Sequence, residues 1–254
     1  MLFGDDAQAT LDKARAIRAQ GFRAAKFGWG PFGASSVAAD EEQLRAAREG
    51  LGRDGLLLVD AGTVWVDDVA AAEARLPALE AVGAVWLEEP FVSGALSAYA
   101  ALAKKCRSVK LAGGEGSHNA WMGRHMIEHG GVGFVQIDAG RIGGLGPAKQ
   151  VADHAAARGV AYVNHTFTSQ LALAASLHPY AGHPAGAICE YPLEAKPVAG
   201  AIAVERLERG PDGLIRLPER PGLGMTVDPA RFAPWLVDVE IKVGGRILYR
   251  TPRP

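Results

Sequence analysis

The feature that most constrains the fold is a regular alternation of short apolar strands with longer helical segments. An initial helix, capped by Asp5 or Asp6, is predicted to run to about Gln20, where Gly21 ends it. Apolar strands then recur at intervals of roughly 24–34 residues, at positions 22–27, 56–59, 85–87, 109–111, 134–137, 161–163 and 187–189. This alternation indicates a parallel sheet of βα units, and eight such units close a barrel.

The two ends of the chain depart from this rhythm. A strand should precede the first helix, so that strand is predicted to be missing or reduced to Met1–Phe3. Prolines and glycines become frequent after about Pro197, and a strand pair is predicted near 237–243 and 246–249. We therefore expect a barrel over residues 1–210 and a separate irregular and β-containing tail over 211–254.

Composition and charge narrow the class of protein. The formal net charge is −1, and hydrophobic residues make up 48% of the chain. No field of one sign would recruit nucleic acid or an anionic membrane, so we expect neither as a partner. Two cysteines make no disulfide framework, and neither a basic-then-apolar leader nor a membrane-length apolar run is present. A reducing cytoplasm is the simplest expectation.

An ionisable residue stands at the carboxyl end of each predicted strand. Functional side chains of a parallel barrel lie at the carboxyl ends of its strands. The residues found at those ends, in chain order, are Lys26, Asp60, Glu88, Glu115, Asp138, His165 and Glu190. Charged residues scattered over a surface would not coincide with every strand end, so we expect these side chains to form one site.

Three carboxylates from successive strands predict a metal site. Asp60, Glu88 and Glu115 would repel one another at a single barrel mouth unless a hard cation neutralised them. Oxygen ligands of this kind favour Mg²⁺ over zinc. The alternative is that one or more of them is a helix cap or a surface ion-pair partner.

Two further strand ends predict acid–base chemistry and substrate binding. Asp138 and His165 end adjacent strands, and a carboxylate bonded to an imidazole fixes its tautomer and raises its basicity. Alone, His165 would more often be a core histidine. Lys26 stands beside a Gly-rich loop and can bind a substrate carboxylate as a point charge, or it can be an ordinary solvent-facing lysine.

At these residues the sequence resembles the enolase superfamily, in its mandelate racemase/muconate lactonizing enzyme-like subgroup. The matching stretches are Gly21-Phe22-Arg23-Ala24-Ala25-Lys26, Leu58-Val59-Asp60, Trp86-Leu87-Glu88-Glu89-Pro90, Gly114-Glu115, Asp138-Ala139-Gly140-Arg141-Ile142-Gly143-Gly144 and Pro221-Gly222-Leu223-Gly224. The resemblance implies a modified TIM-type (β/α)7β barrel in a homo-oligomer. It also implies an N-terminal α+β capping domain, missing or truncated here, against which the 211–254 tail would pack.

The resemblance also implies a role for each site residue. Asp60, Glu88 and Glu115 would hold Mg²⁺, which stabilises the enediolate formed when an α-proton leaves a carboxylate substrate. His165, oriented by Asp138, would be the acid or base. Glu190 would hydrogen-bond the enediolate, and Lys26 would bind the substrate carboxylate.

One departure from the subgroup narrows the expected reaction. The subgroup often carries Lys-x-Lys on the second strand, whereas this sequence has Lys26-Phe27-Gly28. Without a base on the opposite face, dehydration of a sugar acid such as an aldonate or aldarate is expected. Alternatives are a racemase or epimerase of the same superfamily, and a metal-binding barrel that is inactive as a fragment. A phosphate-binding barrel is disfavoured because no Gly-rich phosphate loop follows the last two strands.

Overall fold

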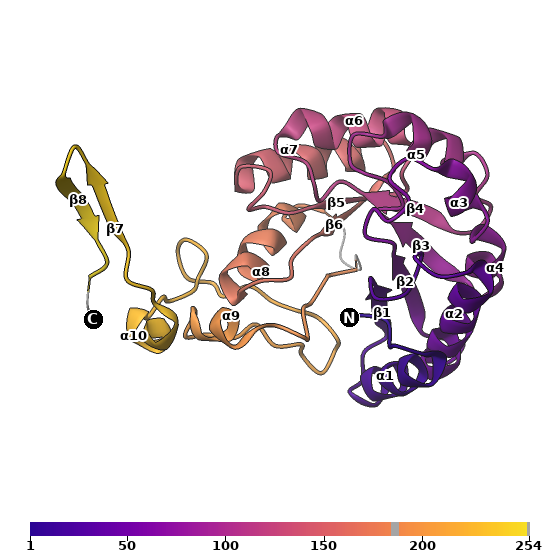
Figure 1. The fold of residues 1–254 in the computed structure, drawn as a ribbon, viewed down its shortest axis with the longest axis horizontal. Coiled ribbons are helices and arrows are strands. Elements are labelled where there is room, and N and C mark those ends of the chain that lie inside the picture. Colours follow the sequence, from indigo (N-terminus) through magenta and orange to yellow (C-terminus); the bar gives the residue numbers. More distant parts are fainter. Residues whose placement is uncertain (184–187, 253–254) are drawn as a thin grey trace. The chain divides into compact units, whose positions relative to one another are not determined.

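The computed structural model describes residues 1–183 and 188–252, and the larger part of the chain forms a curled parallel sheet with helices along its outer side (Figure 1). The sheet has six strands, paired in chain order. They are β1 (Ala24–Gly28), β2 (Leu56–Asp60), β3 (Ala84–Glu88), β4 (Lys110–Gly113), β5 (Phe134–Ile137) and β6 (Ala161–Asn164). The α/β class and the parallel sheet are confirmed, whereas the described strands form part of a barrel and not a closed one.

The register aligns the carboxyl ends of the strands. Gly28 lies opposite Asp60, and Asp60 lies opposite Glu88. Side chains that follow β1, β2 and β3 therefore share one edge of the sheet. At the other side of β1, Leu2 forms a single parallel bridge with Gly28, so the Met1–Phe3 segment pairs with β1 through one bridge.

The strand predicted at 187–189 is not present at the two of its residues that the structure describes. Ala187 lies outside the described residues, and Ile188 and Cys189 adopt no strand conformation. A side chain takes over the pairing, because Asn164 at the end of β6 accepts a hydrogen bond from the Glu190 amide at 2.9 Å. The same side chain donates to the Glu190 carbonyl at 3.0 Å. Glu190 is thereby fixed beside β6 without a ladder of backbone hydrogen bonds.

Helices connect the strands and cover the outer face of the sheet (Figure 1). The helices before β6 are α1 (Ala7–Ala19), α2 (Val37–Leu51), α3 (Val69–Glu73), α4 (Leu76–Ala81), α5 (Leu96–Ala103), α6 (Ala120–Gly130) and α7 (Leu145–Ala156), and α8 (Gln170–Leu177) follows β6. Polar side chains cap several of them: Asp6 accepts from the Ala9 amide at 2.7 Å, and Ser36 accepts from the Ala39 amide at 3.2 Å. Among helices in the described ranges, none is long and apolar enough to cross a membrane.

The helical segment between β2 and β3 breaks into the two short helices α3 and α4. Pro77 stands in the first turn of α4, where its missing N–H costs nothing. At the break, the Arg75 guanidinium binds the buried Asp40 carboxylate at 3.0 Å and the Ala71 carbonyl at 3.0 Å. These contacts take the place of a continuous helical hydrogen-bond ladder.

Alternation along each strand separates the main core from an inner cluster. Leu57, Val59 and Leu87 pack in the large core that includes helix side chains. Residues one position away in sequence form a separate inner cluster, made of Leu58, Trp86, Ala112 and Val163. Because side chains along a strand alternate between faces, Asp60 and Glu88 lie on the same inner side as Leu58 and Trp86.

The chain divides into two compact units. The first comprises Met1–Thr166 and Ser176–Glu190, and it contains the sheet and all seven predicted site residues. The second comprises Phe167–Ala175 and the chain from Tyr191 onward. It holds the short helices α9 (Pro197–Ala201) and α10 (Pro229–Phe232) and the antiparallel hairpin of β7 (Glu240–Val243) and β8 (Arg246–Arg250). The predicted strand pair is confirmed, and the predicted boundary after residue 210 stays a prediction.

Candidate active site

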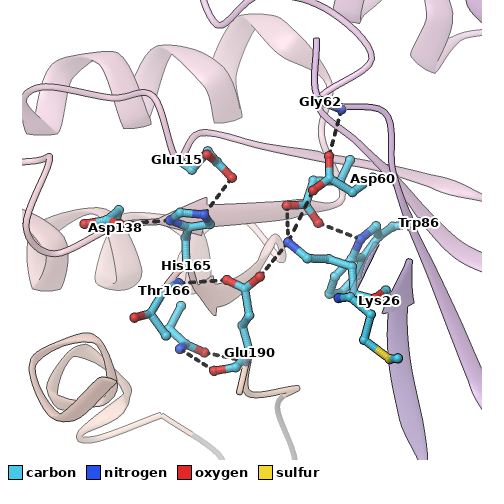
Figure 2. Close-up of polar contacts among 12 residues, drawn as sticks. Lys26, Asp60, Gly62, Trp86, Glu115, Asp138, His165, Thr166 and Glu190 are labelled. Carbon is cyan, nitrogen blue, oxygen red and sulfur yellow. Dashed lines mark hydrogen bonds and ion pairs between the residues drawn. The ribbon is translucent and has the colours of Figure 1, made fainter. Parts of the chain in front are cut away.

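The seven residues predicted from the strand ends lie in two contact groups (Figure 2). The first group contains Lys26, Asp60, Glu88 and Glu190, and the second contains Glu115, Asp138 and His165. A backbone contact joins the groups, because the Thr166 amide donates to Glu190 Oε2 at 2.8 Å. The two groups are thus joined through one backbone contact, and the prediction that they form one functional site stays a prediction.

Lys26 is the cation of the first group. Its Nζ lies 2.5 Å from Glu88 Oε1, 2.6 Å from Glu190 Oε1 and 3.6 Å from Asp60 Oδ2. Burial alone would lower the pKa of Lys26, but the three carboxylates raise it well above its ordinary value. The ammonium therefore stays charged and neutralises a cluster of buried acids.

Glu88 is the most deeply buried of these acids. It is 0% exposed, and its second oxygen accepts a hydrogen bond from the Trp86 indole at 3.1 Å. Burial raises the pKa of Glu88 to about 8, against the lowering effect of Lys26. Burial also raises the pKa of Asp60, whose Oδ1 accepts from the Gly62 amide at 2.8 Å. A carboxylate placed this way is stabilised only by a nearby cation.

His165 is held at both ring nitrogens. Nδ1 lies 2.9 Å from Asp138 Oδ2, and Nε2 lies 3.0 Å from Glu115 Oε2. Asp138 is itself fixed by the amides of Gly140 and Arg141, at 2.8 and 3.0 Å. Burial lowers the pKa of His165, but the hydrogen bonds to Asp138 and Glu115 outweigh it and raise that pKa to about 10. The ring is therefore an imidazolium in this state.

The residues predicted to hold a metal carry other cations here. Within the described ranges, no three His, Cys, Asp or Glu side chains are already spaced to bind a metal ion. Lys26 forms ion pairs with Asp60 and Glu88, whereas Glu115 pairs with His165 and, at 2.6 Å, with Arg141 Nη1. The donor set nevertheless fits Mg²⁺, because it consists of carboxylates on three successive βα units and already gathers positive charge.

The presence of glycine at position 28 has a steric explanation that the sequence alone did not reveal. A Cβ atom at this position would lie 2.6 Å from the Asp60 Cβ and 3.0 Å from its Cγ. Any side chain here, including the second lysine of the subgroup pattern, would force Asp60 to move. Close packing of β1 against β2 at this point therefore favours glycine.

Sequence reasoning missed several contacts of the site. No role was predicted for Arg141 or Trp86, although Arg141 binds Glu115 and Trp86 binds Glu88, both predicted metal ligands. Trp86 stands two residues before Glu88, so the period-two alternation of a strand could have placed both on one face. The Thr166 amide carries no side-chain signal and could not have been found.

The charge on His165 leads to a testable titration. We expect its imidazole in the metal-free chain to lose its proton near pH 10, because Asp138 and Glu115 stabilise the charged ring. Since this pKa lies above the ordinary 6.5, the stabilisation is complete below about pH 6.5 and is lost as the pH rises toward 10. Titration of the ring protons by NMR measures it. Asp138→Asn should lower the midpoint, and a wild-type midpoint near 6.5 would contradict the assignment.

Comparison with known proteins agrees with the family that the motifs indicated. Residues 9–231 match the family model described as enolase C-terminal domain-like. The chain is 30% identical to D-galactarolactone cycloisomerase of Agrobacterium fabrum over 219 residues, which is 83% of this chain and 56% of that protein. It is also 30% identical to arabinonate dehydratase of Saccharolobus solfataricus, over 79% of this chain and 52% of that protein. The chain thus spans about half the length of these curated relatives.

Solved structures extend the likeness to three dimensions. A Rhodobacter sphaeroides protein, described as a predicted mandelate racemase, superposes with a TM-score of 0.92 at 56% identity over 99% of this chain and 64% of that one. An L-talarate/galactarate dehydratase mutant liganded with Mg and L-glucarate gives a TM-score of 0.77 at 26% identity, over 98% of this chain and 56% of that one. The chain therefore belongs to the enolase C-terminal domain-like family, within the mandelate racemase/enolase superfamily.

Proposed function

We propose that this chain forms the catalytic barrel of a Mg²⁺-dependent enzyme that removes the proton α to a carboxylate and eliminates water from a sugar acid. The observation that carries the proposal is the Asp138–His165 pair, 2.9 Å apart, beside a cluster of buried carboxylates. Crowding at Gly28 adds to it, because that position cannot supply a base on the opposite face.

Asp60, Glu88 and Glu115 would hold the metal. Bound Mg²⁺ supplies positive charge that binds the substrate carboxylate and stabilises the negative charge formed when the α-proton leaves. Relatives of this chain include an L-talarate/galactarate dehydratase whose structure contains Mg. In the present structure Lys26 and His165 balance part of the same charge, so both must exchange partners before the site can work.

His165 is the proposed acid and base. Asp138 binds Nδ1, which leaves Nε2 to accept the α-proton once Glu115 has turned away from it and the imidazolium has released its Nε2 proton to solvent. The protonated ring then returns that proton to the departing hydroxyl at the β-carbon. One C–H and one C–O bond break, a carbon–carbon double bond forms, and water leaves. The enol product becomes a 2-keto-3-deoxy acid.

Lys26 and Glu190 would position the substrate. The Lys26 ammonium can bind a substrate carboxylate as a point charge, provided that it releases Glu88. Glu190 is oriented from two sides, by Lys26 at 2.6 Å and by the Thr166 amide at 2.8 Å. Because it contacts both Lys26 and the amide next to His165, it is placed to hydrogen-bond the developing enediolate.

A second candidate function is an isomerase. The similarity to D-galactarolactone cycloisomerase is as high as that to arabinonate dehydratase, and cycloisomerisation could begin with the same single base. A racemase or epimerase is less favoured, because it needs a second base facing His165 and Gly28 has no space for one. Solvent deuterium entering the α-position of both stereoisomers of a substrate would support the racemase.

A library of aldonates and aldarates tests the proposal. We expect a 2-keto-3-deoxy product from at least one member when the protein is assayed with Mg²⁺, in the longest form that its gene encodes. EDTA should abolish the product. If the wild-type protein binds Mg²⁺ but yields neither a keto acid nor an isomer from any member, a metal-binding barrel without turnover replaces the proposal.

A further inference from the structure

Glu89 is an acid in the site that the proposed mechanism does not use. It follows Glu88 directly and is 6% exposed. Glu88 is bound by Lys26 and Trp86, whereas the Glu89 carboxylate forms no hydrogen bond or ion pair with any side chain in the described ranges. A buried carboxylate without a partner is costly, so its presence calls for an explanation.

The backbone at Glu89 is strained. Its φ is +39°, in the left-handed region that residues other than glycine rarely adopt. Two hydrogen bonds hold this conformation: the Glu89 amide donates to the Ala112 carbonyl at 3.0 Å, and its carbonyl accepts from the Thr63 amide at 2.6 Å. In a regular strand Glu89 would point away from the face that carries Glu88.

The charges that act most strongly on Glu89 are those of two proposed metal ligands. Glu115 and Asp60 act on it most strongly among its neighbours. The nearby cations already serve other acids: Lys26 binds Glu88 and Glu190, and Arg141 and His165 bind Glu115. A further carboxylate that interacts with Asp60 and Glu115 increases the repulsion among the acids, unless it binds a further cation or the waters of that cation.

We propose that Glu89 is an outer ligand of the metal site, which accepts a hydrogen bond from a water on the Mg²⁺ held by Asp60, Glu88 and Glu115. This inference rests on the proposed function. Mg²⁺ gives up its waters reluctantly and usually keeps several of them when protein carboxylates bind it. A fixed acceptor for such a water holds the hydrated ion in one orientation and adds negative charge without entering the coordination shell.

Titration calorimetry of MgCl₂ into the chain tests the inference without any assay of activity. Glu89→Gln keeps the shape of the side chain and removes its charge, and it should weaken Mg²⁺ binding by about 10- to 100-fold. Glu88→Gln removes a direct ligand and should weaken binding further. Glu49→Gln, at an exposed acid on α2, is the matched control and should leave the affinity unchanged.

The outcomes separate this inference from the proposed function. No Mg²⁺ binding by the wild type would overturn both. Wild-type binding that Glu88→Gln weakens and Glu89→Gln leaves within about twofold would overturn the outer-ligand role alone. Glu89→Asp is the second variant, in case the glutamine variant fails to fold. It withdraws the carboxylate by one methylene and should also weaken binding, and an unchanged affinity would overturn the role.

Discussion

His165→Asn is expected to slow α-proton abstraction by at least about 10²–10⁴-fold, the usual contribution of a positioned general acid or base. Asparagine can keep a hydrogen bond to Asp138 but cannot take or return a proton at physiological pH. Exchange of the α-proton with D₂O and formation of the keto acid should fall together, since both need this proton transfer. Mg²⁺ affinity should not fall, because the substitution removes a positive charge that lies 3.0 Å from Glu115.

The control for this substitution is His129→Asn. His129 is exposed in the last turn of α6 and has no contact with the site residues, so its loss should leave the rate unchanged. If the His165 variant exchanged the α-proton at the wild-type rate, another residue would be the base, and the proposed reaction would lose its support. Loss of exchange in both variants would point to a general loss of structure, which circular dichroism detects.

Lys26→Met is expected to destabilise the metal-free chain by about 3–5 kcal/mol, the usual loss when one partner of a buried ion pair is removed. The substitution leaves Glu88, Glu190 and Asp60 without the ammonium that lies within 3.6 Å of each. Denaturant unfolding in EDTA measures the loss. Mg²⁺ should then restore part of the stability, because an ion at 100 times its Kd contributes about 2.7 kcal/mol to a folded state that alone binds it.

The matched control is Lys105→Met. Lys105 pairs with Glu73 at 2.9 Å on the surface, where both side chains are nearly half exposed. Exposed pairs of this kind contribute about 0–1 kcal/mol. If Lys26→Met cost no more than Lys105→Met, or if Mg²⁺ gave the variant no protection, the carboxylates would not be arranged around a cation.

Much of the fold followed from the period of the sequence. The strand at Phe134–Ile137 was predicted at its observed bounds, because a short apolar run between two glycine-rich turns has few other conformations. The break between α3 and α4 could not be predicted in this way, since the apolar spacing continues through it, whereas Pro77 and the Arg75–Asp40 contact create it. Contacts between distant side chains are not encoded in local spacing.

The candidate site shows the same division. The seven residues were chosen from their positions at the ends of the predicted strands, because the carboxyl ends of parallel strands meet at one edge. These positions could not show that Lys26 lies among the acids, since any nearby cation would balance the same charges. Nor could they place Glu89, because adjacent strand residues face opposite ways unless the backbone turns left-handed, and a glutamate gives no sign of that.

The central claim is that Asp60, Glu88 and Glu115 hold one divalent cation beside His165. A crystal structure of the protein grown with Mn²⁺, which shares the oxygen-ligand preference of Mg²⁺, tests it through the anomalous signal of the metal. We predict one peak at roughly 2.0–2.1 Å from an oxygen of each carboxylate, or slightly farther for the larger ion, with Lys26 moved off Glu88. Saturating Mn²⁺ with no peak among these residues, and with Lys26 still bound to Glu88, would contradict the claim.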